Sequence, residues 1–147
     1  MMKQGTDLQT SSFDQMLAYE MVKDGFMDEH IRAIRKVYGE RRDVMLAALE
    51  RYFPEGCSWT RPQGGLFLWA RVPEWIDTGD LMAEAVQAQV AYVPGFAFYP
   101  DATRGRNTMR LNFSNAGPAQ MEEGIRRLGN LLKAKVAEHD RLHAVAA

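Results

Sequence analysis

Cysteine is almost absent from this sequence, because Cys57 is the single cysteine among 147 residues. One cysteine cannot form an internal disulfide bond or supply a cysteine-based zinc cluster, and this usage fits a reducing compartment. Long apolar runs are missing too, since no stretch reaches the ~18 consecutive apolar residues of a membrane-spanning helix. The N-terminus lacks the apolar segment of a secretion signal. The sequence therefore predicts a cytoplasmic protein without a membrane partner.

An excess of either charge is also missing, because 18 Lys and Arg face 19 Asp and Glu, for a net charge of −1. Nucleic acids attract strongly basic surfaces, so this balance predicts no nucleic-acid partner. The P-loop and the G-x-G-x-x-G fingerprint do not occur. His139 and His143 have the i, i+4 spacing of zinc ligands, but the glutamate of the zincin motif is lacking, and no metal site is predicted.

The remaining composition, 46% hydrophobic and 25% charged, is that of an ordinary soluble domain. Helical periodicity and capping residues predict helices from Ser11 or Ser12 to Lys23, over 28–53, from Gly79 to about Ala88 with Thr78 as cap, and from Pro118 to about His139. Apolar and β-branched runs predict strands over 57–60, 66–72, 90–93 and 107–114, with 96–106 as a loop. This order predicts an α+β fold, a small antiparallel or mixed sheet with helices on one face.

Aromatic residues gather around the predicted strands. We expect most of the following six to be core residues: Trp59, Phe67, Trp69, Phe96, Phe98 and Tyr99. Basic residues are not interleaved with them, as a nucleic-acid binder would need. The strand 66–72 is apolar at nearly every position, which is typical of a strand covered on both faces. Cys57 has no evident activating partner and is interpreted as apolar filler.

The stretch from Asn107 to Ser114 contains the most informative pattern. Its alternation indicates a strand with two unlike faces, Met109, Leu111 and Phe113 on one and Arg110, Asn112 and Ser114 on the other. A guanidinium on a rigid strand can donate two parallel hydrogen bonds to a carboxylate. From the residues alone, a solvated arginine or a surface ion pair is the more common case. Arginine cannot transfer protons at neutral pH, and no catalytic constellation is recognisable within the chain.

Three segments in fixed order resemble a known family: 61–69 (RPQGGLFLW), 92–95 (YVPG) and 109–113 (MRLNF). They resemble the C-terminal part of class I/II aminotransferases, the pyridoxal-phosphate (PLP) enzymes of fold type I. The start at 3–10 and the Arg126-Arg127-Leu128 ending look most like the branch of 2-aminoadipate and broad-specificity aminotransferases. The resemblance covers about residues 3–133.

This resemblance implies roles for several residues. Arg110 would bind the α-carboxylate of an amino-acid or 2-oxo-acid substrate, and Asn112 would support it, although a plain strand-edge residue fits Asn112 nearly as well. Gly64 and Gly65 would bring backbone near the substrate, where the residues alone indicate a plain hairpin turn. Thr10 and Ser11 would approach the cofactor phosphate of the partner subunit in a homodimer, or serve only as the helix cap.

One family feature is missing. The family's Schiff-base lysine lies in a serine-rich motif upstream of the region that resembles 3–12, and none of the five lysines here has that setting. The resemblance therefore implies the end of a large PLP-binding domain over 1–26, a connecting helix over 27–53, the complete small domain over 54–138 and a frayed tail over 139–147. The N-terminal large domain would be absent, and the isolated chain would be inactive and bind no PLP.

Two other interpretations stay open at this point. Similar domains occur fused to DNA-binding helices in bacterial transcriptional regulators, where they sense ligands. A sister fold type I enzyme, such as a decarboxylase or synthase, would use the same arginine. An upstream winged helix-turn-helix would favour the regulator, whereas the start of an upstream substrate domain would favour the enzyme.

Overall fold

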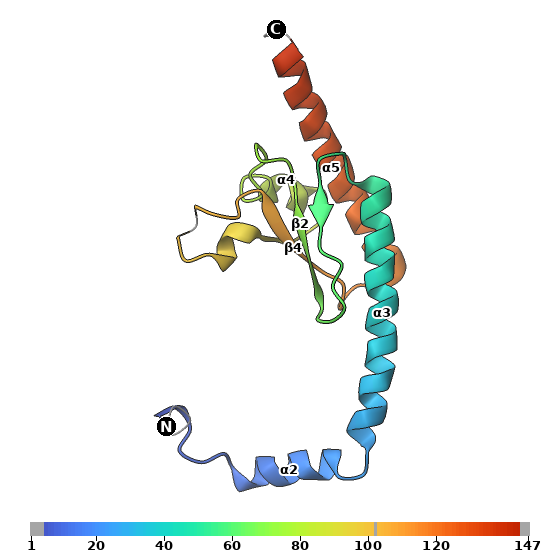
Figure 1. Cartoon of the computed structure of the whole chain (residues 1–147), viewed down its shortest axis with the longest axis vertical. Helices are drawn as coiled ribbons and strands as arrows, with labels where there is room; N and C mark the ends of the chain where they lie inside the picture. Colours follow the sequence, from blue (N-terminus) through green and yellow to red (C-terminus); the bar gives the residue numbers. More distant parts are fainter. Residues whose placement is uncertain (1–4, 102, 145–147) are drawn as a thin grey trace. The chain divides into compact units, whose positions relative to one another are not determined.

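The computed structural model describes residues 5–101 and 103–144, and Figure 1 shows their elements in chain order. The chain divides into two compact units, Met1–Val37 and Tyr38–Ala147. The long helix α3 (Phe26–Tyr52) contributes residues to both units. Among the described residues, no helix has both the length and the apolar character needed to cross a membrane. The four-part division predicted from the sequence stays a prediction.

The first unit contains α2 (Ser12–Val22) and the start of α3. Both helices were predicted to within two residues, and Gly25 takes a φ of +77° between them, a conformation that glycine adopts without strain. No residue of α2 is buried. Phe13, Met16 and Tyr19 are 73%, 68% and 62% exposed, so these apolar side chains of α2 are not buried among the described residues.

The second unit is built on a four-stranded antiparallel sheet of order β1-β2-β4-β3. Its strands are β1 (Ser58–Trp59), β2 (Phe67–Arg71), β3 (Val93–Pro94) and β4 (Thr108–Asn112). Strand β4 lies between β2 and β3, and Arg110 pairs in register with Trp69 on one side and Val93 on the other. The predicted α+β class is confirmed, and the sheet is antiparallel rather than mixed.

One face of this sheet forms the core with α3, α4 (Met82–Gln87) and α5 (Pro118–Ala144). The sheet contributes Leu68, Ala70, Met109 and Leu111, and the helices contribute Met45, Ala48, Leu49, Ala85, Met121, Ile125, Leu128 and Leu132. All of these side chains are at most 4% exposed, as burial of apolar surface requires. Because successive side chains of β4 point to opposite faces of the sheet, the face that carries Arg110 lies outside this core.

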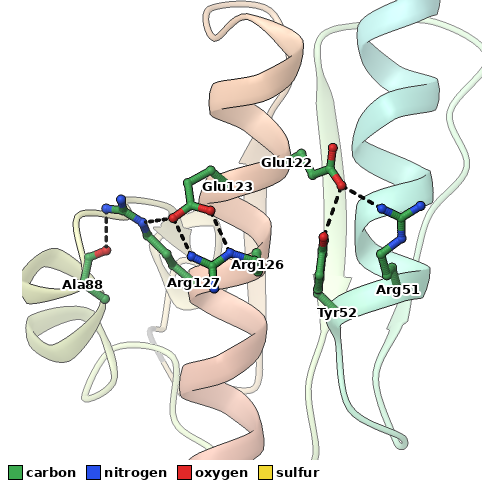
Figure 2. A network of polar contacts seen from close by, with 7 residues as sticks. All are labelled: Arg51, Tyr52, Ala88, Glu122, Glu123, Arg126 and Arg127. Carbon is green, nitrogen blue, oxygen red and sulfur yellow. Dashed lines mark hydrogen bonds and ion pairs between the residues drawn. The ribbon is translucent and has the colours of Figure 1, made fainter.

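Helices α3 and α5 approach each other closely at Gly129. A Cβ atom there would lie 2.4 Å from the carbonyl oxygen of Tyr52, so only glycine fits without a shift of the backbone. Beside this approach, the Glu122 carboxylate accepts hydrogen bonds from the Arg51 guanidinium at 2.8 Å and the Tyr52 hydroxyl at 3.1 Å (Figure 2). The contact joins the second unit's two longest helical segments.

The start of α4 differs from the prediction that Thr78 caps a helix from Gly79. The helix begins at Met82, and Thr78 is fully buried in the core. Its hydroxyl oxygen lies 2.9 Å from the Arg106 carbonyl and 2.7 Å from the Thr108 carbonyl. The threonine therefore connects to the segment entering β4, because buried carbonyls need donors.

The region of β3 is also shorter and more curved than predicted. The predicted strand over 90–93 is reduced to Val93–Pro94, and part of the predicted loop is the 3₁₀ helix η1 (Gly95–Phe98). A Cβ atom on Gly95 would lie 1.8 Å from the Thr108 hydroxyl oxygen. This glycine therefore allows the backbone of η1 to lie directly against β4.

Helix α5 continues to Ala144 instead of ending near His139, where fraying was predicted to begin. The ring of His139 stacks on Trp75 at 4.0 Å between centroids and on His143 at 3.9 Å. This column of rings gives the last turns a partner outside the helix, which the sequence did not reveal. The two histidines thus form a stacked pair along the helix.

Candidate functional site

Arg110 lies on the central strand, on the sheet face opposite the helices. It is half-buried, whereas its neighbours Met109 and Leu111 are at most 4% exposed on the core face. Within residues 5–101 and 103–144, no carboxylate or other hydrogen-bond acceptor engages its guanidinium. The internal ion pair that would have favoured a purely structural arginine is not seen there. Its N–H donors are available to a ligand.

Two phenyl rings lie against this guanidinium. Its central carbon is 4.0 Å from the ring centroid of Phe67 on β2 and 4.9 Å from that of Phe98 in η1. Trp69 meets Phe98 edge to face, with 5.3 Å between centroids. Phe67 and Phe98 are 40% and 45% exposed, and none of the six aromatic residues is fully buried, so the prediction that most of them are core residues is wrong. Strand β2 is covered on one face only, through Leu68 and its core neighbours.

Asn112 lies on the same face of β4 as Arg110, but its amide oxygen is engaged elsewhere. It accepts hydrogen bonds from the Ser114 backbone N–H at 2.6 Å and from the Ser114 hydroxyl at 2.8 Å. The Ser114 carbonyl in turn accepts a hydrogen bond from Arg41 of α3. This geometry makes Asn112 a turn-forming residue at the end of β4. Its support of a substrate stays a prediction.

The Gly64-Gly65 turn connects β1 to β2 as a hairpin. Gly65 has a φ of +80°, and a Cβ atom built on either glycine would meet no heavy atom within 4 Å. The loop is attached to α3, because Arg42 donates a hydrogen bond to the Pro62 carbonyl at 3.2 Å and Arg61 pairs with Glu50. The turn is thus open on its outer side, and its proximity to a substrate stays a prediction.

Thr10 and Ser11 belong to the first unit, immediately before α2. The Thr10 hydroxyl donates to the Asp7 carboxylate at 2.9 Å, and the Thr10 carbonyl accepts from the Gln15 amide at 2.7 Å. Ser11 occupies the N-cap position, yet its hydroxyl makes no capping hydrogen bond. Capping therefore does not account for the side chain of Ser11. The role of both residues at a cofactor phosphate stays a prediction.

The ion pairs of Lys23 and Lys135 do not favour the covalent attachment of PLP to these two lysines. Such a lysine needs a lowered pKa so that its amine is neutral and nucleophilic. Lys23 instead pairs with Glu20, and Lys135 lies 2.7 Å from the Glu84 carboxylate. The hydrogen bond to Glu84 raises the pKa of Lys135. The pairing with Glu84 therefore favours the charged form of Lys135, which does not react with an aldehyde.

The chain resembles aminotransferases over nearly all of its length. It is 46% identical to aromatic-amino-acid aminotransferase 1 of Thermococcus litoralis over 91% of this chain and 32% of the relative. The multiple substrate aminotransferase of Thermococcus profundus superposes with a TM-score of 0.86 and 46% identity, over 92% and 34% of the two chains. A third match is the α-aminoadipate aminotransferase LysN of Thermus thermophilus, complexed with N-(5'-phosphopyridoxyl)-L-leucine. It superposes with a TM-score of 0.80 and 40% identity, over 92% of this chain and 34% of the LysN chain.

Weaker similarity extends to a regulator. The uncharacterized HTH-type transcriptional regulator YisV of Bacillus subtilis is 31% identical over 84% of this chain and 25% of its own length. No protein-family model matches the chain. The chain spans about a third of the length of the aminotransferases that it matches. By sequence and by fold, the chain matches the C-terminal part of aminotransferases of fold type I.

Proposed function

We propose that the full-length polypeptide carrying these residues is a PLP-dependent aminotransferase, and that this chain binds the substrate's α-carboxylate through Arg110. The observation that carries the proposal is the half-buried guanidinium on the central strand, which has no acceptor among the described residues. Aminotransferase relatives at 40–46% identity support the reaction class, the transfer of an amino group between an amino acid and a 2-oxo acid.

The contribution of Arg110 is orientation. A planar guanidinium binds a carboxylate through two parallel hydrogen bonds, and this fixes both the position and the rotation of the amino acid. Holding the substrate in a single orientation supplies a large part of catalysis in such reactions. PLP, when bound, withdraws electrons from the substrate Cα. The proton transfer at Cα falls to a lysine that the described residues do not supply.

The other parts of the assembly follow as proposals. An N-terminal large domain would hold most of the cofactor, and a homodimer would bring Thr10 and Ser11 to the partner subunit's cofactor phosphate. The Ser11 hydroxyl makes no capping hydrogen bond, and this supports that role. A cytoplasmic location fits the single cysteine. The isolated chain should neither bind PLP covalently nor transaminate; a stable adduct at one lysine, trapped with borohydride after incubation with PLP, would overturn this expectation.

The test of Arg110 compares an amino acid with the amine that lacks its carboxylate. In the full-length polypeptide, Arg110→Met should lower kcat/KM for the amino acid by about 10- to 100-fold, since hydrogen bonds between charged groups contribute roughly 1.5–3 kcal/mol. Activity toward the amine should change little. Arg71→Met, which removes an exposed arginine of β2, is the matched control. Equal losses on both substrates would contradict the assignment.

The second candidate function is a ligand-sensing domain of a bacterial regulator, which the similarity to YisV favours. In that case Arg110 would hold an amino-acid effector, and the upstream sequence would encode a winged helix-turn-helix. Amino-acid-dependent DNA binding without transamination would support it. A sister fold type I enzyme would instead convert an amino acid without forming a 2-oxo acid. Product analysis distinguishes the three.

A further inference from the structure

We propose that Phe67 and Phe98 are positioning residues that hold the Arg110 guanidinium ready for the carboxylate; this inference rests on the proposed function. Neither ring was expected to contribute to binding from the sequence. Both lie against the guanidinium of Arg110, one from a neighbouring strand and one from the 3₁₀ helix η1.

The geometry is that of a cation beside aromatic faces. Separations of 4.0 and 4.9 Å from the ring centroids lie within the ~6 Å range of cation–π attraction. A guanidinium has five N–H donors, and cation–π attraction acts on its charge without a hydrogen-bond acceptor. The rings can therefore fix the group without occupying the donors that a carboxylate needs.

The arrangement answers a physical requirement. An unpaired arginine has a long side chain that samples several rotamers, and immobilising such a side chain on binding costs about 0.5–1.5 kcal/mol. Arg110 has no acceptor among the described residues to hold it in place. The two rings supply the restraint that an ion pair would give elsewhere, and they do so without neutralising the charge.

The rings are themselves supported from the sheet. Phe67 is the first residue of β2, and Trp69, the cross-strand partner of Arg110, packs edge to face with Phe98 at 5.3 Å between centroids. Phe98 lies in η1, whose first residue, Gly95, contacts β4 too closely for any side chain. The second ring is thus placed by backbone packing, and the exposure of both rings, at 40% and 45%, leaves the site open to solvent.

The first test observes Arg110 itself in the full-length polypeptide. Ring currents should shift the NMR signals of the Arg110 Cδ protons and Nε–H upfield, with Arg110→Lys identifying those signals. Phe67→Leu and Phe98→Leu should each move them back toward unperturbed positions, and Phe67→Tyr should leave them in place. If the chemical shifts of these Arg110 signals were unchanged in both leucine variants, the proposal would be overturned. This readout needs neither cofactor nor activity, so it survives failure of the proposed function.

The second test uses the ratio of kcat/KM for an amino acid to that for its decarboxylated amine. Phe67→Leu and Phe98→Leu should lower this ratio by about 3- to 10-fold, because the freed Arg110 side chain must be immobilised on binding. Phe67→Tyr keeps a ring at this position and should leave the ratio at its wild-type value. General structural damage would lower both activities and leave the ratio unchanged, which would overturn the proposal. Rings that only contact the substrate's side chain would give the same unchanged ratio. If the wild-type polypeptide did not catalyse transamination, the proposed function would be contradicted, but the positioning of Arg110 by the rings would not.

Discussion

Two glycines of α5 should respond in opposite directions to the same substitution. Gly124 and Gly129 both lie inside the helix Pro118–Ala144. A Cβ atom on Gly124 would meet no heavy atom within 4 Å, whereas one on Gly129 would lie 2.4 Å from the Tyr52 carbonyl oxygen and 2.8 Å from its carbonyl carbon. Gly124→Ala should therefore stabilise the chain, and Gly129→Ala should destabilise it.

The magnitudes follow from two separate effects. Alanine is favoured over glycine inside a helix by about 0.8–1 kcal/mol, which both variants gain. At position 129 the obstacle is backbone of α3, which cannot rotate away, so the cost should lie in the upper part of the overpacking range, at about 2–3 kcal/mol. The residues around it are closely packed, since Leu49, Leu128 and Leu132 have no exposed surface. We expect a net loss of about 1–2 kcal/mol for Gly129→Ala and a gain approaching 1 kcal/mol for Gly124→Ala.

Urea unfolding followed by tryptophan fluorescence and circular dichroism measures both changes, provided that the slopes of the transitions agree. The two variants share helix, residue type and propensity gain, so their difference isolates the contact with Tyr52. A Gly129→Ala chain that is as stable as the Gly124→Ala chain would refute the close approach of α3 and α5. If Gly129→Ala lowers the urea midpoint but Gly124→Ala does not raise it, the expected gain in helix propensity would be refuted instead.

Two further predictions concern titrating groups. Hydrogen bonds from Arg126, and then from Arg127, lower the pKa of Glu123 to about 2 (Figure 2), so its stabilising contribution is present above pH 4.5 and is lost as the pH falls toward 2. Glu123→Gln should weaken the fall of the urea midpoint between pH 5 and pH 2.5; an identical fall would contradict this. Burial raises the pKa of the Cys57 thiol to about 11, so Ellman's reagent should react slowly at pH 8 unless urea is added, and rapid labelling of the folded chain would contradict it.

Periodicity predicted the parts of the fold that depend on local sequence. The helices α3 and α5 and the strands β2 and β4 were found because their apolar patterns extend over several residues, and α2 was found from the capping residues and the glycine at its ends. The shorter elements depended on contacts between distant residues. Thr78 looked like a helix cap, but the carbonyls of Arg106 and Thr108 take its hydroxyl. Gln89, with a φ of +62°, ends the turn after α4 in a conformation that its residue type does not signal.

The sequence predicted the position of Arg110, but it did not predict which residues surround the guanidinium. The alternation along β4 correctly placed Arg110 on the face opposite Met109 and Leu111. The register of β2 against β4, which sets Trp69 beside Arg110, could not be obtained from either strand alone. Phe98 reaches the guanidinium because η1 turns the chain, and this segment was interpreted as a loop.

The position of β4 has a consequence for how long Arg110 keeps its place as the protein fluctuates. Interior strands of a sheet exchange their amide protons only through the larger opening events, while short edge segments such as β3 open readily. Departure of β3 and η1 would remove Phe98 but leave the arginine on the β2–β4 ladder. The protein would thus still bind an acidic ligand through Arg110 while the ring of Phe98 no longer aligns the guanidinium. The Arg110 amide should exchange its proton as slowly as the slowest amides of the chain.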